Sequence, residues 1–334
     1  MLKAMKISLL DQAPVTKGHA APDALQNAEK IAVLADELGY HRMWMAEHHN
    51  TRHFASAAPE VIIAHLAAKT KRLRLGTGGV MMMHYSPLKL AEVFNTLSAL
   101  SPGRIDFGVG RAPGGDHFAT QALAEGRPYL PSDLYDKLAA SLQLIAGGVP
   151  TDPLYKNVVA SPAGIALPEA WLLGSSGNSA VRAGRLGVGY SFAQFFNGQL
   201  SKEILDAYRL NFEPTSFMPE PVVSVTYAAT AAETEEEAEF LAKPVDLMRL
   251  FLTKGMLQPI MSPEEARDYP LTEMDRMQIA ENRSIHFVGT GPQIAERLYR
   301  ERELYGFDEV MINSTPHGFE SRLNGYRLLA KALL

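Results

Sequence analysis

Short apolar segments alternate with amphipathic helical patterns along almost the whole chain, and this alternation constrains the fold more than any other feature. Apolar runs bounded by glycine or charged residues predict eight strands, at residues 5–10, 41–46, 73–78, 105–110, 171–174, 188–193, 222–228 and 309–313. Helical spacing predicts helices at residues 22–38, 58–69, 88–100, 132–145, 179–186 and 319–333. Because parallel strands need a crossover between them, the pattern indicates a parallel sheet. Eight such units in 334 residues fit a (β/α)₈ TIM barrel.

A doubly wound sheet is the alternative fold. It is disfavoured because the first strand is followed by Asp11-Gln12-Ala13-Pro14 and not by the glycine-rich dinucleotide fingerprint. The stretch from Ala238 to Asn282 is too long for one connection, so we expect inserted helices there, before the last strand, as a cover. Thr290 to Gln293 predicts the start of a further helix, which Gly306 ends. The chain is therefore expected to be one domain, residues 1–334, with a helical insertion at about 238–282.

Composition excludes several classes of protein. The net charge of −5 gives no basic field for nucleic acid or an anionic membrane, so neither is an expected partner. The chain has no cysteine, which excludes disulfides and thiolate chemistry. The apolar part of the N-terminus reaches Asp11 too soon for a secretory signal, and no span approaches transmembrane length. A cytoplasmic enzyme is the resulting expectation.

In a TIM barrel the active site lies at the C-terminal ends of the strands. That rule selects four segments, at residues 47–50, 76–79, 108–111 and 174–179. Arg111 follows a strand that ends in glycine, and a guanidinium matches a phosphate through its planar fork of donors. Pairing of Arg111 with a nearby carboxylate is the alternative.

The segment at 174–179 predicts a phosphate cradle, with Gly174, Ser175, Ser176 and Asn178 as candidate contacts. Small residues at the start of a helix leave backbone N–H groups free for an anion. Simple N-capping by Ser176 or Asn178 explains the same residues equally well. Arg111 on the adjacent strand would be the positive partner of the same phosphate.

Two adjacent histidines, His48 and His49, follow the second strand. A metal site is disfavoured, because neighbours on an extended segment point to opposite sides and no third ligand stands at a helical spacing. A catalytic or flavin-contacting imidazole and a purely structural one remain open. Gly78 and Gly79 after the third strand are either a flexible turn or backbone that lies flat against a ring, where a Cβ would collide.

Taken together, these segments resemble the bacterial luciferase-like flavin-dependent monooxygenases. The similarity is spread over six motifs and about residues 5–315, namely Ser8–Pro14, Trp44–His49, Leu75–Gly79, Ser101–Arg111, Leu173–Ala180 and Phe287–Pro292. It is closer to single-chain members of unknown activity than to the light-emitting subunits. The cysteine near the flavin in luciferases has no counterpart in this chain.

The resemblance implies a TIM barrel that uses reduced FMN, supplied by a separate NAD(P)H:flavin reductase, and O₂ to oxidise a small organic substrate. It implies His48 as the catalytic residue, and it implies FMN contacts from Gly78, Gly79, Arg111, Gly174, Ser175, Ser176 and Asn178. It also implies a cis peptide bond between Gly78 and Gly79. No metal is expected. A homodimer through the helices after the second and third strands is expected from the resemblance and from the alanines around residues 55–68.

Two other functions stay open at this point. One is hydride transfer with the deazaflavin F420, which needs no oxygen. The other is a flavin-binding protein without catalytic activity. The sequence does not identify the substrate, and aldehydes, sulfonates and ring compounds all remain candidates.

Overall fold

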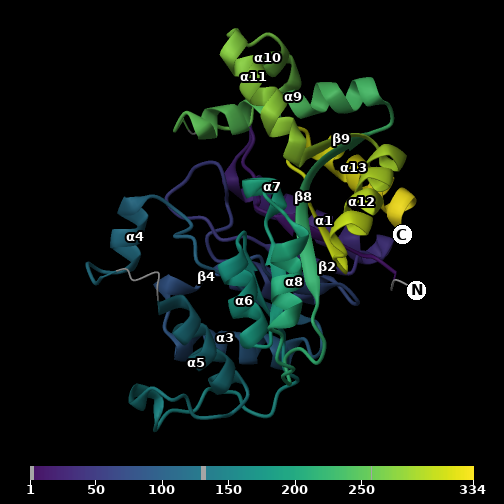
Figure 1. The fold of residues 1–334 in the computed structure, drawn as a ribbon. Coiled ribbons are helices and arrows are strands. Elements are labelled where there is room, and N and C mark those ends of the chain that lie inside the picture. The colour runs from purple at the N-terminus through teal and green to yellow at the C-terminus, as the bar shows by residue number, and fades with distance from the viewer. Residues whose placement is uncertain (1–3, 129–132, 257) are drawn as a thin grey trace.

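The computed structural model describes residues 4–128, 133–256 and 258–334, and its centre is a closed parallel barrel (Figure 1). Eight strands follow one another around it, and the last pairs with the first and with the seventh. They are β1 (Lys6–Asp11), β2 (Arg42–Met45), β3 (Arg74–Thr77), β5 (Ile105–Gly110), β6 (Glu169–Gly174), β7 (Gly189–Phe192), β8 (Val223–Ala232) and β10 (Glu309–Asn313). The predicted TIM barrel is confirmed, with all eight strands where the sequence places them.

Helices surround the barrel and begin and end at the residues that local chemistry favours. They are α1 (Ala21–Leu38), α2 (Pro59–Lys69), α3 (Pro87–Leu100), α5 (Leu134–Ile145), α6 (Gly177–Arg185), α8 (Lys202–Leu210), α12 (Gly291–Tyr305) and α13 (Phe319–Leu333). Pro59 and Pro87 stand in the first turns of α2 and α3, where their missing N–H costs nothing. Gly306 ends α12 with a φ of 74°, as predicted. Ser132, the predicted start of one helix, lies outside the described residues.

Several short elements were not predicted. They are β4 (Val80–Met81), β9 (His286–Thr290), α4 (His117–Leu123), α7 (Gln194–Asn197) and α8. β9 lies outside the barrel, because it pairs only with residues Ala228–Ala232, the half of β8 that extends beyond the other strands. β9 and α12 therefore separate the helical insertion from the last barrel strand.

The end of the barrel interior near the N-termini of the strands holds a buried ion cluster. The guanidinium of Arg42, 1% exposed, donates to Asp106 at 2.7 Å, to Glu169 at 3.0 Å and to Glu309 at 2.8 Å. Burial alone would raise the pKa of Asp106, but Arg42 and Arg74 outweigh it and hold that pKa below its usual value. The cluster thus satisfies charges that would otherwise be costly inside a barrel.

The middle of the barrel is filled by large apolar side chains. Trp44 and Trp171 meet edge to face at 5.4 Å between ring centroids, and Leu10, Met218 and Met311 pack around them. The bulk of the two indoles leaves no space on the neighbouring strands, so glycine is needed there. A Cβ on Gly189, for example, would lie 2.4 Å from the indole ring of Trp171. The interior is therefore filled at the N-terminal ends of the strands. Only the end formed by the C-termini of the strands, called the upper end or mouth below, is available for a ligand.

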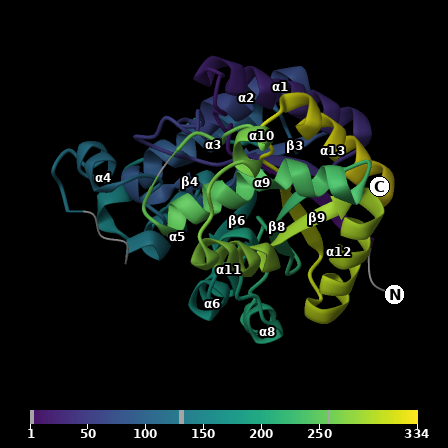
Figure 2. The ribbon, with the colours of Figure 1, turned by 90° about the horizontal axis from the view of Figure 1, so that it is seen from above.

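Three helices between β8 and β9 lie over the C-terminal ends of the strands (Figures 1 and 2). They are α9 (Glu235–Thr253), α10 (Pro263–Arg267) and α11 (Glu273–Asn282). The chain between α9 and α10 is attached to the loop after β1, because the backbone N–H of Lys17 donates to the carbonyl of Ile260 at 2.8 Å. On the side of β7, Arg249 of α9 donates to the carbonyl of Phe195 at 3.0 Å. The insertion is thus anchored to loops after two different barrel strands.

Candidate active site

Three polar side chains from the barrel strands meet at its upper end. Alternation along β1, β2 and β10 turns Leu10, Trp44 and Met311 inward, and the same period continues to Gln12, His48 and Asn313. Gln12 Nε2 lies 3.1 Å from His48 Nε2, and Asn313 Nδ2 lies 3.3 Å from Gln12 Oε1. The sequence predicted His48 at this place, while Gln12 and Asn313 were not recognised as its partners.

The backbone around His48 is held on both sides. Its N–H donates to the carbonyl of Ser56 at 2.8 Å, and its ring stacks on Phe54 with centroids 4.5 Å apart. The loop that carries Gln12 is fixed by Asp11, whose carboxylate accepts from the N–H of Ala13 at 2.7 Å. The imidazole therefore has a defined position before any ligand binds.

An ordinary imidazole titrates near neutral pH, which would suit proton transfer, but the surroundings of His48 shift its pKa. Burial lowers the pKa of its imidazole to about 4, and the neighbouring His49 adds to the effect while Glu47 opposes it. The neighbours of the ring include Gln12 and Phe54, from the loops after β1 and β2. At neutral pH His48 is an uncharged hydrogen-bonding group.

His49 lies in a different environment. Its Nε2 is 2.6 Å from the carboxylate of Glu47, a residue with no exposed surface. The same carboxylate accepts from the Tyr85 hydroxyl at 2.7 Å and from the N–H of Met81 at 2.8 Å. His49 and Glu47 thus tie the loop after β2 to β4 and to the segment that follows it. Among the described residues, no group of three His, Asp or Glu side chains could hold a metal ion.

The peptide bond between Gly78 and Gly79 is cis, as the resemblance implies. A Cβ on Gly78 would lie 2.8 Å from atoms of Leu10 and Trp44, and one on Gly79 would lie 2.9 Å from the backbone after Val109. Packing against the barrel interior and the neighbouring strand is therefore enough to require glycine at both positions. Contact with a ring remains a prediction.

The loops that carry Arg111 and the predicted phosphate cradle leave the barrel side by side. Val109 pairs with Leu172, so the residues directly after β5 and β6 are neighbours at the same edge. Arg111 is exposed there. The N–H groups at the first turn of α6 have no acceptor within the helix. The two predicted anion-binding features therefore face the same end of the barrel.

The start of α6 is also organised internally. Ser176 is the N-cap, and its hydroxyl accepts from the N–H of Ser179 at 3.4 Å. The buried Ser179 hydroxyl lies 3.0 Å from the Tyr190 hydroxyl, which donates to the carbonyl of Ser176 at 3.1 Å. N-capping, the alternative interpretation of Ser176, therefore applies. It leaves the exposed side chain of Asn178 and the first N–H groups of the helix for a ligand.

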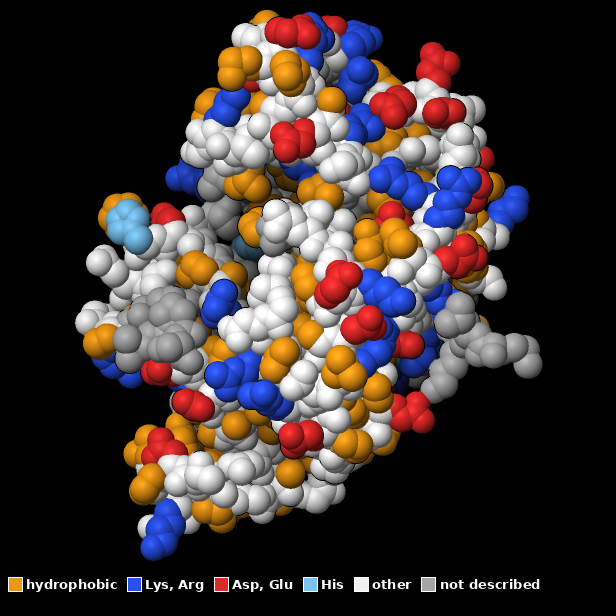
Figure 3. Space-filling model, in the orientation of Figure 1, with side chains coloured by type: hydrophobic (Ala, Val, Ile, Leu, Met, Phe, Trp, Pro, Cys, Tyr) orange, Lys and Arg blue, Asp and Glu red, His pale blue; other side chains and the backbone are white. Residues whose placement is uncertain are grey.

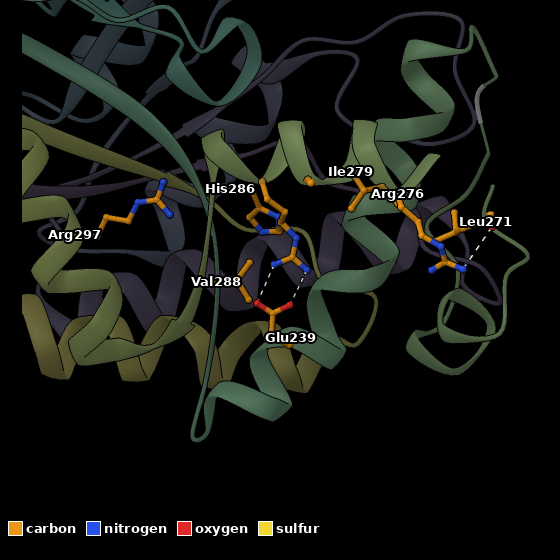
Figure 4. A pocket seen from close by; sticks show the side chains of 9 residues that line it. Glu239, Leu271, Arg276, Ile279, His286, Val288 and Arg297 are labelled. Carbon is orange, nitrogen blue, oxygen red and sulfur yellow. Dashed lines mark hydrogen bonds and ion pairs between the residues drawn. The ribbon is translucent and has the colours of Figure 1, made fainter. Parts of the chain in front are cut away.

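A pocket of about 530 Å³ lies on the outer side of the insertion, between α9, α11, β9 and α12 (Figure 4). Arg283 at its wall is neutralised by Glu239, at 3.0 Å, and by Asp246, at 2.6 Å. Figure 4 shows Arg276 directed toward Leu271, whose carbonyl oxygen accepts from its guanidinium at 3.5 Å. None of the residues selected from the sequence lines this pocket. We therefore place the candidate site at the barrel mouth.

On the face shown in Figure 3, basic and acidic side chains are interspersed and do not gather by sign. Among the described helices, none is long and apolar enough to cross a membrane.

Three histidines make stability depend on pH. Burial lowers the pKa of His41 to about 3 and of His48 to about 4, and it lowers that of His286 far below its usual value. Neighbouring arginines add to the shift of His41 and His286. The unfolded chain therefore binds more protons than the folded one at pH values between these pKa values and about 6.5.

Stability from these groups is nearly complete above pH 6.5 and is lost as the pH falls below that value, down to about 4 for His48 and about 3 for His41. We expect His41 and His48 each to cost about 2 kcal/mol of stability at pH 5 relative to pH 7, measured by urea unfolding. Replacing His286 with asparagine should flatten this dependence. Replacement of the exposed His19 with asparagine is the control variant. Equal slopes in the two variants would contradict the assignment.

Comparison with known proteins gives one family over nearly the full length. The sequence model of the luciferase-like monooxygenases matches residues 5–309. N-acetyl-S-alkylcysteine monooxygenase of Bacillus subtilis (strain 168) is 36% identical over 332 residues, which cover 99% of this chain and 98% of that protein. The uncharacterized protein YwcH of the same organism is 40% identical over 330 residues, which cover 98% of this chain and 99% of that protein.

Solved structures agree with this family. The crystal structure of apo-MsnO8 is 35% identical, with a TM-score of 0.90 and 99% coverage of both chains. A type II Baeyer–Villiger monooxygenase from the CAM plasmid of Pseudomonas putida, solved in complex with FMN, has a TM-score of 0.72 at 20% identity, covering 99% of this chain and 98% of its own. An F420-dependent secondary alcohol dehydrogenase has a TM-score of 0.70 at 14% identity, covering 99% and 100%. These last two show a shared fold alone.

Proposed function

Because the chain belongs to the luciferase-like monooxygenase family, we propose that it binds reduced FMN at the barrel mouth and uses O₂ to oxidise a small organic substrate. The cofactor assignment rests on one observation: two anion-binding features, Arg111 and the N-terminus of α6, lie at the same edge of the barrel. Arg111 leaves β5 beside the loop that opens α6, and that helix presents its N-terminus there.

The residues at this edge fit a phosphate group. The first turn of α6 offers unpaired backbone donors, Asn178 is exposed above them, and Arg111 supplies positive charge. Gly174 allows the loop to turn closely, since a Cβ there would lie 2.3 Å from the Ser179 hydroxyl. In this proposal Ser175 and Ser176 add contacts, while the isoalloxazine lies above Gly78 and Gly79, near His48.

The flavin supplies the oxygen chemistry when it is bound, and the chain supplies position, hydrogen bonds and exclusion of water. The insertion, anchored to the loops after β1 and β7, covers the mouth. His48 offers an uncharged hydrogen-bonding group at the upper end of the interior. The buried ion cluster and the two indoles close the lower end.

The substrate is proposed only as a class. A relative at 36% identity is named for the oxidation of N-acetyl-S-alkylcysteine, so thioethers of this kind are the first compounds to assay. Aldehydes, sulfonates and ring compounds follow. A homodimer, a separate flavin reductase and a cytoplasmic location stay predictions.

The choice of cofactor is tested by anaerobic titration with reduced FMN and with reduced F420. Preference for FMN supports the proposal. Preference for F420 would favour hydride transfer. Tight FMN binding without turnover of any substrate class would favour a storage protein.

Replacement of Arg111 by alanine is expected to weaken binding of reduced FMN by about 1.5–3 kcal/mol, the contribution of a hydrogen bond to a charged group. Anaerobic fluorescence titration measures the effect. Arg185→Ala is the matched control, since Arg185 is an exposed arginine at the opposite end of α6. Unchanged affinity in a folded Arg111→Ala variant would remove Arg111 from the phosphate site.

A further inference from the structure

A chain of hydrogen bonds connects the last barrel strand to His48. It begins at the backbone carbonyl of Leu10, which lies 3.2 Å from Asn313 Nδ2. The same nitrogen lies 3.3 Å from Gln12 Oε1, and Gln12 Nε2 lies 3.1 Å from His48 Nε2. Asn313 is 5% exposed, and this chain of bonds is independent of any ligand.

The direction of every bond in this chain is fixed by its first member. A backbone carbonyl can only accept, so Asn313 must turn its amide nitrogen toward Leu10. That nitrogen then donates to Gln12 as well, and Gln12 must present its oxygen to Asn313. Only the amide nitrogen of Gln12 is left to face His48, and an amide nitrogen can only donate.

We propose that Asn313 and Gln12 are positioning residues that fix the tautomer of His48, with Nε2 as a hydrogen-bond acceptor and the ring proton on Nδ1. A protonated Nε2 would place two donors against each other at 3.1 Å. The charged or titratable groups that act on the ring are His49 and Glu47, from its own segment.

The consequence for chemistry depends on the proposed function. With Nε2 occupied by Gln12, His48 meets a bound flavin or substrate as a hydrogen-bond donor through Nδ1–H. It is not available as a base through Nε2. His48 would therefore act as a neutral hydrogen-bond donor, already oriented before a ligand binds, and not as a proton acceptor.

The test is nitrogen NMR of the flavin-free protein with ¹⁵N-labelled histidine at pH 7. The two ring nitrogens give separate signals, and the signal of a protonated nitrogen differs from that of one with a lone pair. The His48 signals are identified by their loss in His48→Gln. We expect a protonated Nδ1 and an unprotonated Nε2 in the unmodified protein.

Gln12→Glu tests the cause with almost no change in shape. One carboxylate oxygen would still accept from Asn313, and the other would face His48 Nε2 and could only accept. The proton should therefore appear on Nε2, and the pKa of His48 should rise. Gln26→Glu, on the exposed surface of α1, adds the same charge and should leave the His48 signals unchanged.

If Gln12→Glu does not fold, Asn313→Leu gives the second test, because Gln12 is then free to turn and both tautomers should appear. A proton on Nε2 in the unmodified protein would overturn the proposal. So would a Gln12→Glu variant that keeps the proton on Nδ1. Failure to bind FMN would refute the proposed function without changing these spectra, so the two failures are distinguishable.

Discussion

Replacement of His48 by alanine is expected to lower turnover by about 10²–10⁴-fold, the range for a catalytic hydrogen-bonding or proton-transfer group. Affinity for reduced FMN should stay close to that of the unmodified protein, because His48 lies at the end of β2 and the phosphate features lie after β5 and β6. Oxygen-dependent product formation with a reductase-supplied flavin measures turnover. Anaerobic titration measures affinity.

His49→Ala is the matched control for this result. His49 contacts Glu47 and takes no part in the hydrogen bonds that join Gln12, Asn313 and His48. Removing the His49 ring should therefore reduce stability more than turnover. If His49→Ala abolishes turnover while His48→Ala does not, the assignment of the catalytic histidine is wrong by one residue. If neither variant affects turnover, both histidines are structural.

Replacement of Arg42 by methionine is expected to lower the free energy of unfolding by about 3–5 kcal/mol. The variant would leave the fully buried carboxylates of Asp106 and Glu309 without their shared cation. Urea unfolding at pH 7 measures the loss. Asp106 keeps its contact with Arg74, which limits the effect to this range.

Arg300→Ala is the control, because Arg300 pairs with Glu296 on the exposed surface of α12. Such pairs contribute about 0–1 kcal/mol. Combining Arg42→Met with Asp106→Asn and Glu309→Gln should recover part of the loss, since fewer buried charges remain unpaired. A loss below 1 kcal/mol for Arg42→Met alone would contradict the described cluster.

The barrel could be predicted from the sequence because its strands are short, largely apolar runs and its helices are periodic. β5 and α13 show this clearly, and α13 begins and ends at the predicted residues Phe319 and Leu333. β9 could not be predicted, because a five-residue segment that pairs with half of one strand carries little periodic signal. α8 had a usable signal in Leu205 and Tyr208, which are three residues apart and both buried.

The candidate site was partly predictable for a different reason. The rule that places active sites at strand ends selects His48 and Arg111 from the sequence alone. The same rule applied to β1 and β10 would also have selected Gln12 and Asn313, which stand 301 residues apart and meet only because the barrel closes. The lowered pKa of His48 comes first from burial, which no residue pattern around His48 indicates.

We propose that the protein transfers oxygen from O₂ to an organic substrate with reduced FMN. The most direct test mixes the anaerobic complex of the protein and reduced FMN with ¹⁸O₂, in the presence of N-acetyl-S-alkylcysteine or a member of each other substrate class. Mass spectrometry of the product should show one ¹⁸O atom per molecule oxidised, and His48→Ala should reduce the yield. A product whose new oxygen comes from water would contradict the claim, as would turnover that needs reduced F420 and proceeds without O₂.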